Sequence, residues 1–147
     1  MNEFMKAAIE EARFGIRRGH GGPFGCVIVK GGRIIGKGHN EVIKQNDPTC
    51  HGEMMAIRKA CKTLGTFDLS ECELYTTAQP CPMCQGAIQW ANLKKCYYGC
   101  TIFDTERIGF RDAAFYSDHE DTAQQVDHEE CLELFEEYQS ISDKTPY

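Results

Sequence analysis

Three residues of metal-ligand type stand at informative spacing in the first hundred positions. Cys81 and Cys84 form a Cys-x-x-Cys pair after Pro80, and His51 precedes Cys81 by 30 residues. Two thiolates and one imidazole make a soft tetrahedral site that suits Zn²⁺. A Cys-x-x-Cys pair alone also occurs in redox proteins and in structural zinc sites, so the histidine is needed to choose between these functions.

Glu53 lies two residues after His51, where it can face the metal without binding it. Three protein ligands leave a fourth position for water, as in catalytic zinc sites. Zinc lowers the pKa of that water towards neutrality, and a nearby carboxylate can then move its proton. The pattern therefore predicts hydrolysis at zinc, with Glu53 as the catalytic acid and base.

The His-x-Glu spacing is not specific by itself, because it occurs three times. His39-Asn40-Glu41 and His128-Glu129-Glu130 also match. Only the copy that begins at His51 is followed by Pro-Cys-x-x-Cys with one predicted helix and one predicted strand between them. We therefore assign the metal chemistry to this copy.

Two predicted helices position the ligands at their N termini, where unpaired N–H groups and the helix dipole favour thiolate over thiol. Proline at position 80 and glycine at position 65 mark a helix start and a helix end. The Gly31-Gly32 pair predicts a two-residue hairpin. The secondary structure of residues 103–126 is ambiguous from the sequence. Periodicity predicts helices over 2–18, 51–64, 80–90 and 131–138, and strands over 24–29, 33–38, 73–77 and 95–99.

This order of elements predicts a three-layer α/β/α sandwich. The chain has 147 residues, of which 41% are hydrophobic, which suits one domain over residues 1–147. No run of 18 apolar residues occurs, so we expect no contact with a membrane. The start of the chain lacks the apolar region of a signal peptide, and nine cysteines, an odd number, fit a disulfide framework poorly. We therefore expect a cytoplasmic protein with reduced thiols.

The net charge of −6 is unevenly distributed. Residues 1–100 hold 13 Lys and Arg against 9 Asp and Glu, a balance of +4, whereas residues 101–147 hold 3 against 13, a balance of −10. An acidic final third repels phosphate, so a nucleic-acid partner is disfavoured.

The complete pattern, His-x-Glu at 51–53 followed by Pro-Cys-x-x-Cys at 80–84, is the signature of zinc deaminases. The chain resembles the cytidine deaminase superfamily, and within it the small bacterial guanine deaminases. The resemblance extends over nearly the whole chain and implies the sandwich of the cytidine deaminase type, with a central mixed sheet. Its main segments are 21–25, 46–49, 51–61, 80–90 and 109–112.

The resemblance also implies roles for individual residues. It implies one zinc ion held by His51, Cys81 and Cys84, with Glu53 as the proton shuttle. Further residues match positions that bind the base: the Asn40 amide holds the purine ring, Phe24 and Trp90 line the pocket, and the Asp112 carboxylate contacts the amino-bearing edge of guanine. A carboxylate suits that edge, since guanine presents two donors there, N1–H and the 2-amino group.

The implied reaction is hydrolysis of guanine to xanthine and ammonia. In this family the C-terminal segment, here about residues 127–147, crosses to the partner subunit. That implies a swapped homodimer in which Tyr147 closes the neighbour's site.

Some residues depart from the family pattern. Gly52 and Gln79 stand where alanine and glutamate are usual, and a glycine at position 52 is familiar from cytosine deaminases. Arg111 precedes Asp112 and would weaken base recognition if it paired with that carboxylate.

Three other functions remain open. The first is deamination of cytosine or of another free base or nucleoside. The second is deamination of adenosine in tRNA, which the charge balance of −10 disfavours. The third is a structural zinc module, for which no fourth ligand stands at suitable spacing.

Two groups of residues are expected outside the site. We expect surface positions for His20, His39, His119 and His128, and buried apolar positions for Cys26, Cys61, Cys72, Cys96, Cys100 and Cys131.

Overall fold

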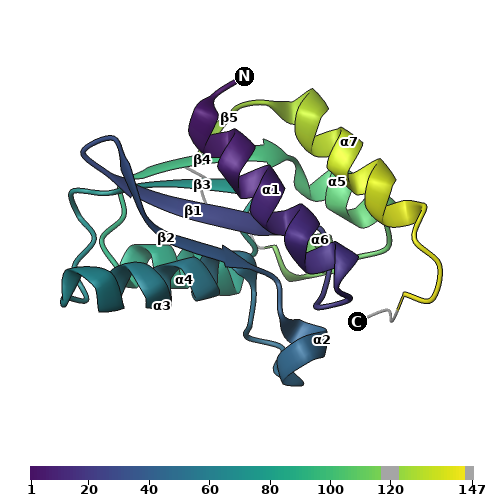
Figure 1. Ribbon diagram of the computed structural model, residues 1–147, viewed down its shortest axis with the longest axis horizontal. Coiled ribbons are helices and arrows are strands. Elements are labelled where there is room, and N and C mark those ends of the chain that lie inside the picture. The colour runs from purple at the N-terminus through teal and green to yellow at the C-terminus, as the bar shows by residue number, and fades with distance from the viewer. Residues whose placement is uncertain (117–122, 145–147) are drawn as a thin grey trace.

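The computed structural model describes residues 1–116 and 123–144, which form a five-stranded sheet in the order β2-β1-β3-β4-β5 (Figure 1). Strand β1 pairs antiparallel with both β2 and β3, whereas β3–β4 and β4–β5 are parallel. The predicted mixed sheet is therefore confirmed. The strands are β1 (Gly25–Lys30), β2 (Arg33–His39), β3 (Glu73–Ala78), β4 (Lys95–Cys100) and β5 (Gln124–Gln125).

Helices cover both faces of this sheet, which gives the expected three layers. Helices α1 (Glu3–Arg17) and α7 (His128–Gln139) lie on one face, and α3 (Gly52–Leu64) and α4 (Pro82–Trp90) lie on the other (Figure 1). Side chains of β1 alternate between the two cores, with Val27 and Val29 facing α1 and α7, and Cys26 and Ile28 facing α3 and α4. This alternation explains why β1 is apolar at nearly every position.

Turn residues have the conformations that the sequence predicts. Gly31 and Gly32 have φ values of 56° and 77°, as a two-residue hairpin between β1 and β2 requires. Gly65 ends α3 in the left-handed conformation, with φ of 68°.

The ambiguous region contains two short helices and an edge strand, α5 (Ile102–Arg107), α6 (Asp112–Phe115) and β5. Another short helix, α2 (Val42–Gln45), follows β2 and was not predicted, because four residues are too few to show a period. Helix α7 begins at His128, three residues before the predicted start. Within residues 1–116 and 123–144, every helix is too short or too polar to cross a bilayer.

Most of the cysteines predicted to be apolar core residues are buried, and all nine are free. Only Cys61 of that group is partly exposed. The expectation of four surface histidines is wrong for His39, which is 6% exposed. Its ring is covered by α1, which is far from it in sequence. His119 lies outside the described residues.

Glu137 links helix α7 to α1 through ion pairs with two arginines. Its Oε2 accepts a hydrogen bond from Arg13 Nε at 2.9 Å, and its Oε1 accepts one from Arg17 Nη2 at 3.1 Å. Partial burial raises the pKa of the Glu137 carboxyl, but the hydrogen bonds from Arg13 and Arg17 outweigh it and lower the pKa below its ordinary value. A lowered carboxyl pKa means that the folded state favours the ionised form.

We expect Glu137→Gln to lower the free energy of unfolding by about 1 kcal/mol at neutral pH. Because the folded-state pKa lies below the unfolded one, this stabilisation is complete above the ordinary glutamate pKa of 4.5 and is lost as the pH falls through the folded value. Urea unfolding at pH 7 and at acid pH measures both quantities. Glu136→Gln, on the exposed face of the same helix, is the matched control, and an equal loss in both variants would contradict the assignment.

Candidate metal centre

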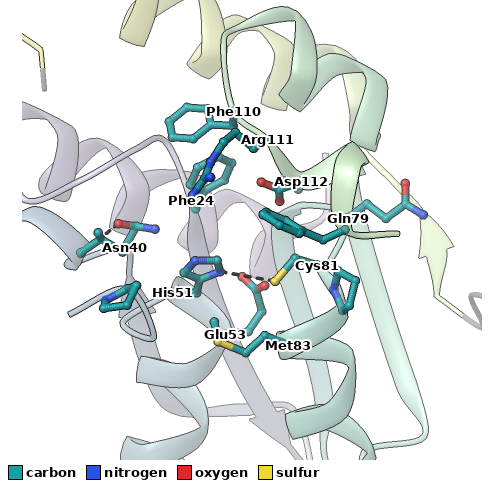
Figure 2. A pocket seen from close by; sticks show the side chains of 15 residues that line it. Phe24, Asn40, His51, Glu53, Gln79, Cys81, Met83, Phe110, Arg111 and Asp112 are labelled. Carbon is teal, nitrogen blue, oxygen red and sulfur yellow. Dashed lines mark hydrogen bonds between the residues drawn. The ribbon is translucent and has the colours of Figure 1, made fainter. Parts of the chain in front are cut away.

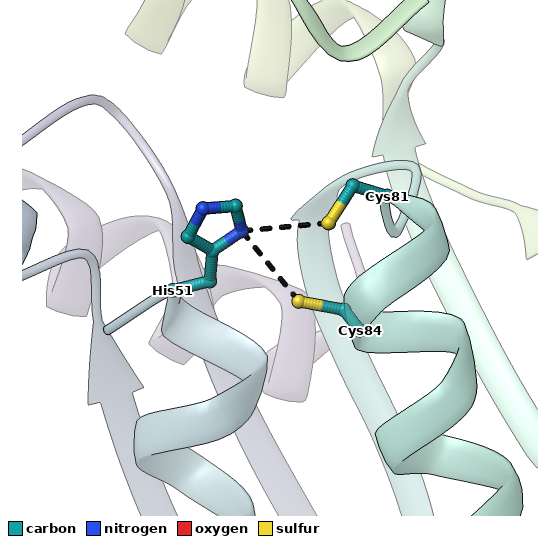
Figure 3. A group of neighbouring side chains, drawn as sticks. All are labelled: His51, Cys81 and Cys84. Carbon is teal, nitrogen blue, oxygen red and sulfur yellow. Dashed lines mark hydrogen bonds between the residues drawn. The ribbon is translucent and has the colours of Figure 1, made fainter. Parts of the chain in front are cut away.

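Two helix N termini bring the three predicted ligands together. Strand β2 is antiparallel to β1, which is antiparallel to β3, so the carboxyl ends of β2 and β3 lie on the same side of the sheet. Helix α3 comes after β2 and the short α2, with His51 as its N-cap residue. Helix α4 follows β3, with Cys81 as its N-cap residue and Cys84 in its first turn. Figure 3 shows the imidazole facing both sulfurs across the gap between the helices.

The spacing of these three atoms fits a zinc ion. His51 Nδ1 lies 3.5 Å from Cys81 Sγ and 3.6 Å from Cys84 Sγ. Tetrahedral zinc with ordinary Zn–N and Zn–S bonds separates its nitrogen and sulfur ligands by about 3.6 Å. The His51, Cys81 and Cys84 ligand atoms all lie within 4.8 Å of one another. The donor set and its geometry therefore both suit zinc, with one coordination position left for a solvent molecule.

The electrostatics of the two cysteines show why a cation belongs between them. Hydrogen bonding from Cys84, helped by His51, lowers the pKa of Cys81 to about 4. The pKa of Cys84 is raised, first because its thiol donates to Cys81 and then because it is buried. Without a metal, one sulfur is a thiolate and the other keeps its proton. A divalent cation supplies the charge that lets both sulfurs be thiolates.

His51 is also shifted by these sulfurs. Its burial lowers the imidazole pKa, but the hydrogen bond and the charge of Cys81 outweigh that effect and raise it. A histidine binds a metal only as the neutral imidazole, so zinc binding at this site would release the imidazole proton.

Glu53 stands beside the metal centre in the first turn of α3. Its side chain is 5% exposed, and Oε1 accepts a hydrogen bond from Thr76 Oγ1 at 3.1 Å. Burial raises the pKa of the Glu53 carboxyl, and the negative charge of Cys81 adds to this. A carboxyl whose pKa is raised towards neutrality can both accept and return a proton, as a general acid–base requires.

A cavity of about 340 Å³ opens onto His51, Cys81 and Glu53 (Figure 2). A volume of this size suits a single small molecule. Most of its wall is apolar, with a few polar side chains that converge on the metal centre. Besides His51, Glu53 and Cys81, it is lined by Phe24, Asn40, Val42, Pro48, Ala78, Gln79, Pro82, Met83, Phe110, Arg111, Asp112 and Phe115.

Three of the residues predicted to bind the base lie in this cavity. Asn40 is 1% exposed, and its Oδ1 accepts the Val42 N–H at 3.0 Å, so its amide nitrogen faces the cavity (Figure 2). Gly21 leaves room for this side chain, since a Cβ at that position would lie 2.1 Å from Asn40 Oδ1. Phe24 forms one wall, where it packs edge-on against Phe110 with ring centroids 4.9 Å apart.

Asp112, the third, is the first residue of α6. Burial raises the pKa of its carboxyl, and the charge of Cys81 raises it further, so the two groups are close enough to interact. Tyr116, just after α6, donates a hydrogen bond to the carbonyl of Pro80 and so ties this segment to the metal-binding loop.

Arg111 lines the cavity but forms no ion pair with Asp112. Its guanidinium carbon instead lies 5.4 Å from the centroid of the Phe115 ring. The pairing that would weaken base recognition is therefore not formed, because Arg111 precedes the helix that Asp112 begins and its side chain extends over the aromatic ring.

One further residue predicted to contact the base, Trp90, does not lie in this cavity. Trp90 is 87% exposed at the C-terminal end of α4, whereas the metal ligands are at the N-terminal end. In its own chain, Trp90 therefore does not line the pocket as expected. Tyr147 lies outside the described residues.

The sequence patterns missed several residues of the site. Phe110, Phe115 and Met83 line the cavity, but single aromatic or methionine residues in short segments carry no periodic signal. Thr76 could have been found, because a hydroxyl in the middle of an apolar strand must have a buried partner. Its partner is Glu53.

Known proteins are similar to this chain in sequence and in fold. The family model for the zinc-binding region of cytidine and deoxycytidylate deaminases matches residues 1–100. A guanine deaminase from Bacillus subtilis is 44% identical over 98% of this chain and 97% of its own, and its crystal structure superposes with a TM-score of 0.74. A guanine deaminase from Nitrosomonas europaea is 27% identical, with a TM-score of 0.85 over 94% of this chain and 84% of that one.

A third relative matches a smaller part of this chain. The tRNA-specific adenosine deaminase from Aquifex aeolicus is 46% identical, but over 63% of this chain and 60% of its own. The full-length match to the Bacillus subtilis enzyme and the family match over the metal-binding residues agree with each other. This chain therefore belongs to the zinc-dependent cytidine and deoxycytidylate deaminase family.

Proposed function

We propose that this deaminase hydrolyses guanine to xanthine and ammonia. The observation that carries the proposal is the Asp112 carboxylate, which lies in the cavity beside the metal centre. A carboxylate there accepts the N1–H and 2-amino donors of guanine, whereas cytosine lacks this pair. The end-to-end similarity to the Bacillus subtilis guanine deaminase supports the same substrate.

The reaction adds the oxygen of water to C2 of the ring and breaks the bond from C2 to the amino nitrogen. Zinc, when bound, lowers the pKa of water so that hydroxide is available at neutral pH. Glu53 accepts the proton of water and delivers it to the ring nitrogen beside C2. It then takes the proton of the new hydroxyl group on C2 and transfers it to the departing amine, which leaves as ammonia while C2 becomes a carbonyl carbon. Thr76 holds the carboxylate in position for these transfers.

Residues on the other side of the cavity orient the base. The Asn40 amide donates to an acceptor on the purine ring, and Phe24 packs on the ring as an apolar wall. Both side chains are held by the protein before substrate arrives, so little entropy is lost when they bind it.

The chain's thiols favour a reducing compartment, because oxidation of Cys81 and Cys84 would abolish the metal centre. All nine cysteines are free, which fits a cytoplasmic enzyme.

We expect Glu53→Gln to retain zinc and fold but to lower turnover by about 10²- to 10⁴-fold, since glutamine accepts the Thr76 hydrogen bond and cannot move protons. Ammonia release from zinc-loaded enzyme measures turnover, with guanine, guanosine, cytosine, cytidine and adenine compared as substrates. Glu71→Gln, an exposed carboxylate, is the control. Full activity in Glu53→Gln would refute this mechanism, and a preference for another base would refute guanine as the substrate.

Cytosine is the second candidate, because Gly52 matches cytosine deaminases of the same superfamily. Asp112→Asn separates the two. The loss of charged hydrogen bonds, each worth about 1.5–3 kcal/mol, should reduce kcat/KM for guanine at least tenfold. Activity on cytosine should not fall. Glu106→Gln, an exposed acid on α5, is the control, and unchanged guanine kinetics in Asp112→Asn would remove the main support for this substrate.

We also infer a homodimer that exchanges the C-terminal segment, in which the partner subunit's α7 would take the place on α1 that this chain's own α7 occupies here. Met83 and Trp90 lie seven residues apart, hence on one face of α4, and are 37% and 87% exposed. A second subunit would bury this apolar face.

Mixed dimers test whether Tyr147 acts in the partner's site. Tyr147→Ala chains keep Glu53, whereas Glu53→Gln chains keep Tyr147. When the two are co-expressed with different tags, the Tyr147→Ala site of each heterodimer receives an intact tyrosine from its partner. One of the two sites is then complete, so the heterodimer should have about half of wild-type activity. Ammonia release from the doubly purified heterodimer measures this. An inactive heterodimer, or a monomer by light scattering, would contradict the exchange.

A further inference from the structure

A second group of metal-ligand residues lies where β2 ends, beside the cavity wall rather than at its floor. His20 Nδ1 and His39 Nε2 are 2.8 Å apart. A carboxylate oxygen of Glu41 completes the group, with all three ligand atoms within 4.8 Å of one another. His39 and Glu41 belong to a His-x-Glu sequence that the deaminase chemistry does not use. His39 is the last residue of β2 and Glu41 is the N-cap residue of α2, so the turn from strand to helix brings their side chains together.

His39 has the outer partner that metal-binding histidines usually have. Its Nδ1 lies 2.9 Å from Glu11 Oε1, and the side chains of His39 and Glu11 are 7% and 18% exposed. The hydrogen bond with His39 lowers the pKa of Glu11, so the carboxylate is ionised and accepts the Nδ1 proton. That fixes the tautomer and leaves the Nε2 lone pair directed at His20. A carboxylate, an imidazole and then a metal is the common order in protein metal sites.

The surrounding chain holds both rings in place. Gly15 lies directly against His39, since a Cβ at that position would be 2.5 Å from the ring. The backbone carbonyl of His20 accepts hydrogen bonds from the N–H groups of Ile43 and Lys44, each at 3.1 Å. Burial lowers the pKa of His20, followed by the proximity of His39, and this favours the neutral form that binds metals.

We propose that His20, His39 and Glu41 bind a second ion, a divalent transition metal such as zinc. Two imidazoles and one carboxylate form a donor set that suits zinc, nickel or copper and does not suit magnesium or calcium. The ion replaces the proton that His20 Nδ1 shares with His39 Nε2. It also replaces the ion pair between Glu41 and Lys44, which measures 3.3 Å and involves a half-exposed lysine, so little stability is lost.

This second ion would act on the pocket through Asn40. His39 and Glu41 are the residues before and after Asn40, so a metal that joins their side chains fixes the backbone on both sides of that residue. The ion itself stays outside the lining of the cavity, because neither His20 nor Glu41 contributes to that lining.

Metal content tests the proposal without relying on deamination. Full-length protein is equilibrated with zinc, freed of unbound ion and analysed by mass spectrometry. Wild type should hold two zinc ions per chain and His20→Asn one. His20 is preferred to His39 for substitution because it is only partly buried. His128→Asn is the matched control, since His128 also pairs with a carboxylate, Asp104, at 2.6 Å, and should retain both ions.

Two results would overturn the proposal. One is a single zinc per chain in the wild type. The other is loss of the second ion in His128→Asn but not in His20→Asn, which would place it among Cys100, Asp104 and His128.

Cobalt(II) gives an independent measurement with Glu41→Gln as a second variant. The first equivalent should produce the strong thiolate-to-cobalt absorption of the centre with two cysteines. A second equivalent should add only weak bands from nitrogen and oxygen ligands, and Glu41→Gln should weaken its binding by at least tenfold. Thiolate absorption that grows with the second equivalent, or binding unaffected by Glu41→Gln, would contradict the site.

Discussion

The N termini of α3 and α4 meet on one side of the sheet, and the metal centre depends on that meeting. Neither helix alone presents a complete set of ligands, because one supplies the imidazole and the other supplies both sulfurs. The nitrogen-to-sulfur distances of 3.5 and 3.6 Å are close to those of tetrahedral zinc. This arrangement arises because β2 and β3 run in the same direction, so that the helices after them begin on the same side of the sheet. The metal chemistry therefore depends on the sheet topology.

The same region concentrates negative charge in a buried space. Glu53, Asp112 and the Cys81 sulfur lie around one cavity, and the pKa of each carboxyl is raised by burial and by the nearby thiolate. Such an arrangement is unfavourable without a cation. Zinc binding relieves the repulsion between these negative groups and leaves Glu53 able to exchange protons. The same buried negative charge therefore destabilises the metal-free site and serves catalysis in the zinc-bound site.

Two separate hydrophobic cores, one on each face of the sheet, hold the elements that carry this site. Helices α3 and α4 carry the ligands on one face, while α1 and α7 close the other face. Helix α1 also reaches the pocket indirectly, because Glu11 and Gly15 hold His39, the neighbour of Asn40. Residues far from the metal in sequence therefore shape the wall on which a base would rest.

The sequence by itself determined the local elements and the candidate metal ligands. Turn glycines, helix periods and the His-x-Glu and Cys-x-x-Cys spacings are short-range signals, and the structure confirms the sandwich that they predict. Only the tertiary structure decided which residues surround the pocket. It brought Phe110 and Phe115 to the cavity, turned Arg111 away from Asp112, placed Trp90 in solvent and buried His39 against Glu11, 28 residues away. These contacts join distant segments, and their geometry depends on how whole layers pack, which no local pattern records.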